Sequence, residues 1–157
     1  MTSTAYFQPT FEQNHVGKKL VNLSSDTFNF GLIASGTLAS RGTAEGYEFV
    51  SSLLANGGSA LTEVSTSGTG YTRQALTSVT YTVSGLVVTF TAANPSWTSA
   101  TLSTVYGWIH DETASSGTDA TRPLVCIFDF GGAQVVSGAT FTLTVSGSGL
   151  VTWTAAL

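Results

Sequence analysis

Cysteine and charge are scarce in this chain. Its 157 residues include one cysteine, Cys126, so no intrachain disulfide can form and the fold must depend on its hydrophobic core. Charged residues make up 9% of the chain, whereas an ordinary soluble domain has about 25%. This scarcity argues against an enzyme with clustered ionisable groups. We therefore expect no catalytic residue, no metal and no cofactor.

Basic residues are too few and too scattered to form a nucleic-acid-binding surface. Lys18-Lys19 is the one adjacent basic pair, and the net charge is −4, whereas phosphate-backbone binding needs a basic patch. No apolar run reaches the roughly 18 residues that cross a bilayer. The first residues lack the basic start and apolar stretch of a secretory signal. We expect neither a nucleic-acid partner nor a membrane partner.

Residues 77–97 are the most informative segment. Two uncharged runs of β-branched and aromatic residues meet at Ser84-Gly85, and threonine alternates with apolar residues in both runs. Alternation with period two and a glycine turn predict a β-hairpin. One face of this hairpin would carry hydroxyl groups instead of charges, which suits packing against other protein surfaces.

The same pattern elsewhere predicts a mainly β fold, an antiparallel β-sandwich or jelly-roll-like barrel. A short N-terminal helix is expected from residue 9 or 10 to residue 23, and a second short helix at 47–54, ended by Asn56-Gly57-Gly58. The length fits one domain, with an N-terminal arm at 1–10 and a single β-rich domain at 11–157. The expected strands are 27–34, 77–84, 86–93, 101–110, 123–130, 140–146 and 150–155, with a short edge strand at 61–64 and turns at 84–85, 93–96, 113–121, 131–138 and 147–149.

The densest group of metal-ligating residue types is His110-Asp111-Glu112, with Asp119 nearby. In an extended segment, neighbouring side chains point to opposite faces, so these three residues cannot all converge. No EF-hand spacing is present, and calcium prefers six to eight oxygen ligands. We favour an acidic, solvated loop tip over a calcium site, and a zinc site least of all.

Cysteine and tryptophan are the remaining candidates for chemistry or ligand binding. Cys126 lies in an apolar run, which favours a small buried hydrophobe over a nucleophile. Exposed tryptophans can stack on sugars, but Trp108 and Trp153 fall in expected strands, where core packing is favoured. Trp97 follows Asn94-Pro95-Ser96 near an expected turn, so its ring is the best candidate for an exposed or interface position.

Several segments, taken in order, resemble a group of small virion proteins of tailed bacteriophages. Each motif is short, and the order is more specific than any single one. Residues 35–58 and the loop after Trp108 have no counterpart in the group. The segments are 20–30 (LVNLSSDTFNF), 61–76 (LTEVSTSGTGYTRQAL), 90–98 (FTAANPSWT), 105–108 (VYGW) and 128–141 (FDFGGAQVVSGATF).

The resemblance implies a virion structural role and brings no catalytic residues. The first expectation is a capsid decoration (cement) protein, made in the bacterial host cytoplasm, that binds the major capsid protein on the outside of the head. It would self-associate as a symmetric oligomer such as a trimer. The alternatives are a tail or baseplate component, or a carbohydrate- or receptor-binding module that uses Trp97 and the loop 111–121. The expected interface residues are Tyr6, Phe7 and Phe11 in the arm, Arg41 and Arg73 as cationic anchors, and Trp97.

Overall fold

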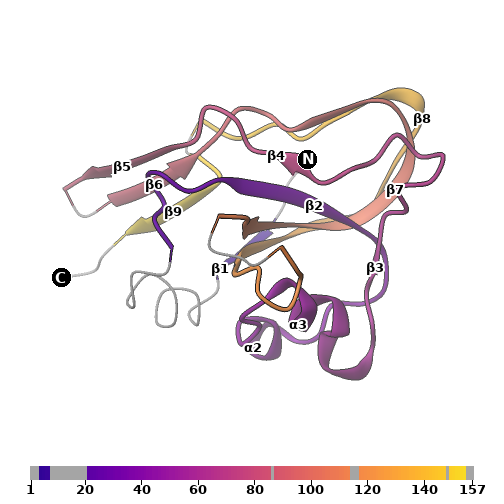
Figure 1. The fold of residues 1–157 in the computed structure, drawn as a ribbon, viewed down its shortest axis with the longest axis horizontal. Helices are drawn as coiled ribbons and strands as arrows, with labels where there is room; N and C mark the ends of the chain where they lie inside the picture. The colour runs from indigo at the N-terminus through magenta and orange to yellow at the C-terminus, as the bar shows by residue number, and fades with distance from the viewer. Residues whose placement is uncertain (1–3, 8–20, 86, 114–116, 148, 155–157) are drawn as a thin grey trace.

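The computed structural model describes residues 4–7, 21–85, 87–113, 117–147 and 149–154 (Figure 1). The expected mainly β, antiparallel fold is confirmed. The helical elements are α2 (Arg41–Ala44), α3 (Val50–Ala55) and the single 3-10 turn η2 (Asn56–Gly58). The strands are β1 (Thr4–Phe7), β2 (Phe28–Ser35), β3 (Thr62–Glu63), β4 (Gln74–Ala75), β5 (Thr80–Ser84), β6 (Val87–Thr91), β7 (Ser96–Asp111), β8 (Leu124–Thr142) and β9 (Val151–Thr154).

Two sheets make up the fold. The larger has the strand order β1-β8-β7-β2-β3, with β4 also paired to β2, and the smaller has the order β5-β6-β9. Figure 1 shows the smaller sheet at one end of the molecule and α2 and α3 below the larger sheet. No helix of the described residues is long and apolar enough to cross a bilayer.

Strands β7 and β8 are much longer than expected, and they form one continuous antiparallel pair. The expected turn at 131–138 is wrong: β8 runs through it, and the chain does not reverse. The register passes from Thr104↔Gln134 to Tyr106↔Asp129, so residues 130–133 bulge out of the ladder. Glycines 131 and 132, with φ of 71° and 145°, supply the backbone conformation for this bulge. The expected turn at 93–96 also ends early, because β7 begins at Ser96.

The first core cluster lies between the larger sheet and the smaller sheet. Phe28 of β2 meets Phe90 of β6 edge-to-face, with ring centroids 5.2 Å apart. Phe30 stacks on Phe128 at 5.4 Å, and its ring also meets Trp97 at 6.4 Å. These buried aromatic contacts join β2 to β7 and β8 within the larger sheet and to β6 of the smaller sheet.

The second core cluster covers the other face of the larger sheet. Trp108 and Ile127 from the sheet pack with Val50 and Leu53 of α3, and all four are fully buried. The alternation of side chains along a strand explains why adjacent residues, such as Trp108 and Ile109, enter different clusters. The helical layer therefore seals this face of the sheet.

Glycine allows close packing where β2 and β7 pair. Gly31 lies opposite Trp108, and a Cβ atom built on Gly31 would lie 2.2–2.5 Å from the indole ring. On the other face, a Cβ atom on Gly107 would lie 2.5 Å from the ring of Phe30. An aromatic ring thus covers each glycine, a pairing that stabilises glycine within a strand. Gly31 therefore makes room for Trp108.

The N-terminal expectations need one correction. Residues 4–7 were expected to lie in a polar arm, but they form β1, an edge strand whose register runs from Thr4↔Asp129 to Phe7↔Cys126. Partner strand β8 supplies the hydrogen-bonding groups, which local periodicity cannot reveal. Most of the helix expected to end at residue 23, and Phe11 with it, lies outside the described residues.

The other local expectations hold or change little. The second short helix is confirmed as α3, and Asn56 ends it in the left-handed conformation with φ of 45°. The expected short edge strand is confirmed as β3. The hairpin around Ser84-Gly85 is confirmed by the regular pairing of β5 with β6. Between β2 and α3 the chain forms a single helical turn, α2.

Candidate functional site

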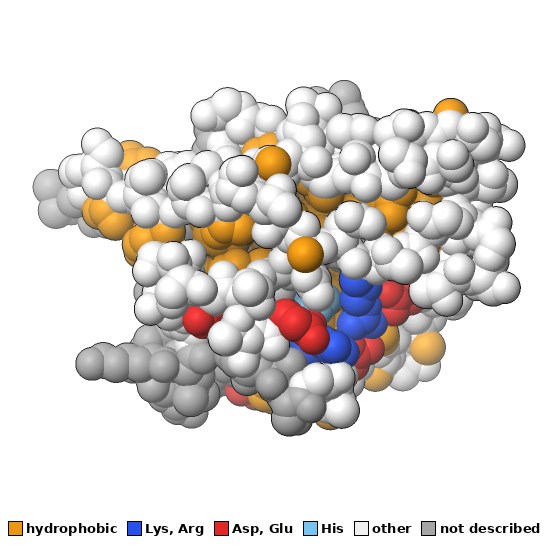
Figure 2. Space-filling view, turned by 45° about the horizontal axis from the view of Figure 1, so that its top comes forward, with side chains coloured by type: hydrophobic (Ala, Val, Ile, Leu, Met, Phe, Trp, Pro, Cys, Tyr) orange, Lys and Arg blue, Asp and Glu red, His pale blue; other side chains and the backbone are white. Residues whose placement is uncertain are grey.

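The densest group of charged side chains joins β3, β7, the segment before β4 and the loop before β8. We call it the ionic cluster; in Figure 2 its acidic and basic atoms lie together, on a face that is otherwise mostly white and orange. All of its members are partly or fully shielded from solvent. They are Glu63, Arg73, His110, Glu112, Asp119 and Arg122.

Arg73 is the centre of the cluster. Its guanidinium donates to Asp119 at 2.6 and 2.9 Å and to Glu63 at 2.7 and 2.8 Å, so it holds both carboxylates in bidentate geometry. The guanidinium carbon also lies 5.2 Å from the ring centroid of Trp108, a cation–π distance. We expected Arg73 to be a cationic anchor for a partner. Its charge is instead paired within the chain.

Arg122 makes the second half of the cluster. It donates to both oxygens of Glu112 at 2.7 Å and to Oδ1 of Asp119 at 3.0 Å. Asp119 therefore accepts hydrogen bonds from both arginines. These bonds, those from Arg73 most of all, lower the pKa of Asp119 to about 2. Hydrogen bonds from Arg122 likewise lower the pKa of Glu112. Both carboxylates are ionised at neutral pH.

His110 closes the cluster on its buried side. Its Nε2 lies 3.1 Å from Oε2 of Glu112, and the residue is 0% exposed. Burial, and after it the nearby positive charge of Arg73, lower the pKa of the imidazole to about 4. His110 is therefore neutral at neutral pH. Without an opening to solvent, it is poorly placed to exchange protons with a substrate.

The expectation of a solvated loop tip at His110-Asp111-Glu112 is wrong. His110 and Asp111 are both 0% exposed, because β7 continues to Asp111, which pairs with Phe28 of β2. The alternation argument was sound: His110 and Glu112 share a face, two residues apart. Among the described residues, no three His, Cys, Asp or Glu side chains are arranged to hold a metal ion. Guanidinium groups of the chain itself face the carboxylates of Glu63, Glu112 and Asp119.

The cluster fixes the loop before β8 to its surroundings. The hydroxyl of Tyr71 donates to Glu63 at 2.8 Å and accepts from the backbone N–H of Leu32 at 2.9 Å, which ties β2 to the cluster. The first N–H groups of α3, at Val50 and Ser51, donate to the carbonyls of residues 122 and 119. Each contact joins segments far apart in sequence. The geometry is that of a structural fastening between the sheet, the loop and α3.

Trp97 is buried, so the expectation that its ring is exposed is wrong. The residue is 1% exposed, and its indole N–H donates to the carbonyl of Thr72 at 2.7 Å. The ring stacks on Tyr71 at 6.1 Å and meets Phe141 at 5.8 Å. The sequence could not reveal this, because the rings that cover Trp97 belong to Phe30, Tyr71 and Phe141, which come from segments distant in the chain.

The remaining candidates are spread over different elements. Tyr6 and Phe7 lie in β1, paired with Ile127 and Cys126, and Arg41 begins α2. Cys126 is fully buried, as expected, and burial raises the pKa of its thiol.

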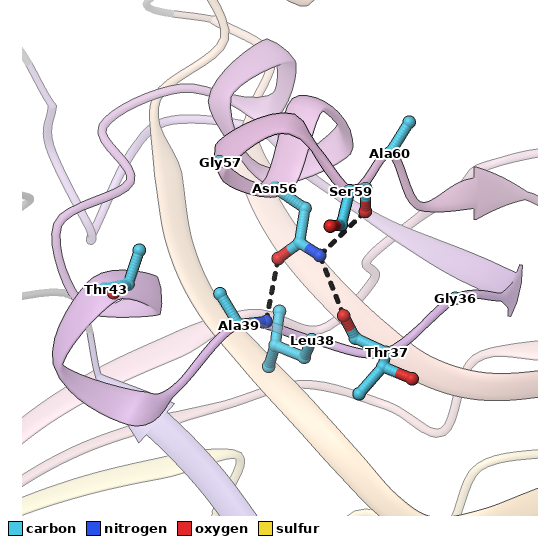
Figure 3. Close-up of a pocket in the computed structure, with 9 residues that line it drawn as sticks. All are labelled: Gly36, Thr37, Leu38, Ala39, Thr43, Asn56, Gly57, Ser59 and Ala60. Atoms are coloured by element: carbon cyan, nitrogen blue, oxygen red, sulfur yellow. Dashed lines mark hydrogen bonds between the residues drawn. The ribbon is translucent and has the colours of Figure 1, made fainter.

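A surface hollow lies beside η2 (Figure 3), and Asn56 occupies its floor. The amide oxygen of Asn56 accepts from the N–H of Ala39 at 2.8 Å and from the hydroxyl of Tyr47 at 3.0 Å. Its amide nitrogen donates to the carbonyls of Thr37 and Ser59 at 2.8 and 2.9 Å. This side chain holds the walls of the hollow together and is fully engaged in doing so. The lining residues are Gly36, Thr37, Leu38, Ala39, Thr43, Asn56, Gly57, Ser59 and Ala60.

Comparison with protein-family models, with curated proteins and with solved structures finds no match to this chain.

Proposed function

We propose that this protein is a structural component of a tailed-bacteriophage virion, a capsid decoration protein that binds the outer surface of the head. The observation that carries the proposal is the ordered series of segments between residues 20 and 141 that resembles small phage virion proteins. The major capsid protein is the proposed partner, and the virion is the proposed location. No catalytic step is part of this role.

The exposed surface supports the proposal. No Lys, Arg, Asp or Glu occurs between residues 74 and 109 or between residues 130 and 157, so most of the sandwich surface is neutral. Residues 131–134 and 137–140 of β8 are mostly exposed and small or polar, and Val135 is 74% exposed. Contacts on such a surface desolvate few charges, which suits a permanent interface.

The internal pairing of the charged groups also supports a mechanical role. Glu112, Asp119, Arg73 and Arg122 satisfy one another, and His110 is buried. A protein that bridges neighbouring capsid subunits acts by adding interface area against the pressure of packaged DNA. It needs a rigid body, and the ionic cluster and two core clusters provide rigidity.

A tail or baseplate component is the alternative within the same class, and the same surface would suit it. The carbohydrate-binding alternative loses support, because Trp97 and Trp108 are 1% and 0% exposed and cannot stack on a sugar. In the loop 111–121, Glu112 and Asp119 are engaged with arginines.

Fractionation of virions tests the proposal. Phage particles that encode this chain would be disrupted, and heads and tails separated by density gradient and analysed by quantitative mass spectrometry. A decoration protein is expected in the head fraction at hundreds of copies per particle. A few copies confined to tails would indicate the alternative, and absence from both fractions would overturn the virion role.

Recombinant protein added to heads that lack it provides the binding measurement. Co-sedimentation should saturate at a fixed ratio to the major capsid protein. Deleting residues 1–10 is expected to weaken this binding. That deletion also removes β1, which pairs with β8. The truncated chain must therefore be shown to fold by circular dichroism before its binding is interpreted.

A further inference from the structure

Strand β5 is an edge strand without the usual protection. It pairs with β6 on one side, no described strand pairs with its other side, and all five of its residues are exposed. Natural edge strands are usually shielded by a charged residue, a proline or a bulge, which prevents pairing with another chain. Strand β5 has no charge and no proline. Its register with β6 is regular from Thr80↔Thr91 to Ser84↔Val87.

Exposed apolar side chains gather on this same strand. The exposed large hydrophobic residues of the described chain are Tyr81 at 38%, Val83 at 62% and Val135 at 74%. Tyr81 and Val83 lie two residues apart and so share one face of the sheet. Their neighbour on that face, Phe90, pairs with Tyr81 and is fully buried. Figure 2 shows hydrophobic atoms reaching the surface at the end of the molecule where β5 and β6 lie.

We propose that β5 pairs antiparallel with β5 of a second copy of this chain, about a two-fold axis at Thr82. The two smaller sheets then form one continuous six-stranded sheet. In this register Thr82 lies opposite the partner's Thr82, and Tyr81 lies opposite the partner's Val83. Alternate residues of β5 direct their backbone N–H and C=O groups away from β6, and these groups supply the hydrogen bonds of the new ladder.

The side chains of β5 favour a second copy of the same strand as its pairing partner. The register brings together two aromatic–β-branched pairs, a favourable cross-strand combination. No like charges meet at the axis, because residues 74–109 contain no Lys, Arg, Asp or Glu. The axis is perpendicular to the sheet, so the Tyr81 and Val83 side chains of both copies share one face.

This symmetry makes a dimer, since an interface of a patch with itself closes on two copies. It replaces the trimer expected from the resemblance. The inference deepens the self-association of the proposed virion protein, but it rests on the β5 edge alone.

Sedimentation equilibrium of the full chain is the first test. The wild type should reach about twice the monomer mass of 16.2 kDa as its concentration rises. Val83→Lys places a charge beside the partner's Tyr81 and should raise the dissociation constant roughly tenfold or more. Val135→Lys is the matched control, because it changes an equally apolar and exposed residue on β8 and should leave the dimer intact. A wild type that stays monomeric, or equal weakening by both variants, would overturn the proposal.

Disulfide trapping tests the register. Native Cys126 is fully buried, so an introduced cysteine is the accessible thiol for an oxidant. Thr82→Cys should form a covalent dimer rapidly, because residues directly opposite have Cβ atoms about 5 Å apart. Thr80→Cys is the control on the same strand and face: two such residues would be separated by roughly four residues, or about 13 Å, along the ladder. Equal trapping of both variants would contradict pairing about Thr82.

The proposed dimer and the proposed virion role can be disproved independently of each other. Monomeric wild-type protein found on heads would overturn the dimer and leave the decoration role standing. Wild-type protein that dimerises but is absent from heads and tails would overturn the virion role and leave the dimer standing.

Discussion

The indole N–H of Trp108 donates a hydrogen bond to Nδ1 of His110, with a nitrogen–nitrogen distance of 3.2 Å. An indole nitrogen can only donate, so Nδ1 must be the unprotonated acceptor. The proton of the neutral ring therefore lies on Nε2 and points to Glu112. Protonating His110 would place two N–H groups face to face at Trp108, in addition to burying a charge.

Stability should consequently fall in mild acid. The pKa of His110 is about 4 in the folded chain, against 6.5 for an unperturbed histidine. Between these values the unfolded chain binds a proton that the folded chain does not, so stability decreases as pH falls from 6.5 to 4. The full loss should be roughly 2–3 kcal/mol. Urea denaturation across this pH range, in a His15→Gln background that leaves His110 as the one histidine, measures it.

His110→Gln is the matched variant, because its amide oxygen can accept from Trp108 and its amide nitrogen can donate to Glu112 without titrating. Its stability should be nearly constant from pH 6.5 to 4. An unchanged pH dependence in this variant would show that another group is responsible.

Asp119→Asn should destabilise the chain by about 2 kcal/mol at neutral pH, because Arg73 and Arg122 lose the carboxylate that both share. The pKa of Asp119 is about 2 in the folded chain, against an ordinary value of 3.8. Its contribution is therefore present above pH 3.8 and is lost as pH falls toward 2. The two proteins should approach each other in stability at that acidity. Asp129→Asn is the control, since its amide oxygen can still accept from the N–H of Gly131. Comparable destabilisation by both variants would argue against the cluster.

Gly31→Ala should cost at least about 2 kcal/mol, because its methyl group would overlap the Trp108 ring. Gly147→Ala adds the same methyl group where no atom lies within 4 Å, and thermal unfolding should barely change. In the double variant Gly31→Ala/Trp108→Leu, the two losses should be less than additive, since the smaller side chain relieves the overlap. Strict additivity would mean that the contact does not determine the cost.

Asn56 offers a way to separate backbone conformation from side-chain bonding. Asn56→Gly keeps the left-handed φ of 45° but removes the amide, and should cost about 2–3 kcal/mol for the lost buried hydrogen bonds. Asn56→Ala also loses conformational tolerance and should cost about 1 kcal/mol more. Chemical denaturation of the wild type and the two variants measures both costs: that of the lost hydrogen bonds and that of the left-handed conformation in alanine. Equal stability of the two would show that the left-handed conformation is relaxed in the alanine variant.

The sequence predicted those elements whose signals are local. Alternation over residues 80–91 was enough for the β5–β6 hairpin, and Asn56-Gly57-Gly58 was enough for the end of α3. The prediction of seven strands was wrong at the Gly131-Gly132 pair, because a glycine pair is compatible with more than one local structure. A Gly-Gly pair marks a turn or a bulge equally well, and only the presence of β7 alongside determines that residues 130–133 form a bulge.

The ionic cluster was beyond local prediction for the same reason. His110, Glu112 and Asp119 were singled out as one group and Arg73 separately as an interface residue. Their pairing, and the parts of Glu63 and Arg122, depend on segments that the fold brings together. Without the arginines, the acidic residues looked like a solvated tip. The available signal was the small number of charged residues, because basic and acidic side chains that are both rare can be expected to form ion pairs with one another.

The pairing of β1 with β8 has a consequence for how the protein is made. Thr4 pairs with Asp129, and Phe7 with Cys126, so β1 must wait for a partner strand that is synthesised much later. Ladders between sequence-distant segments form slowly, because the intervening chain must first be ordered. The larger sheet is therefore completed only after residues 126–129 have been synthesised, and until then β1 has no strand to pair with.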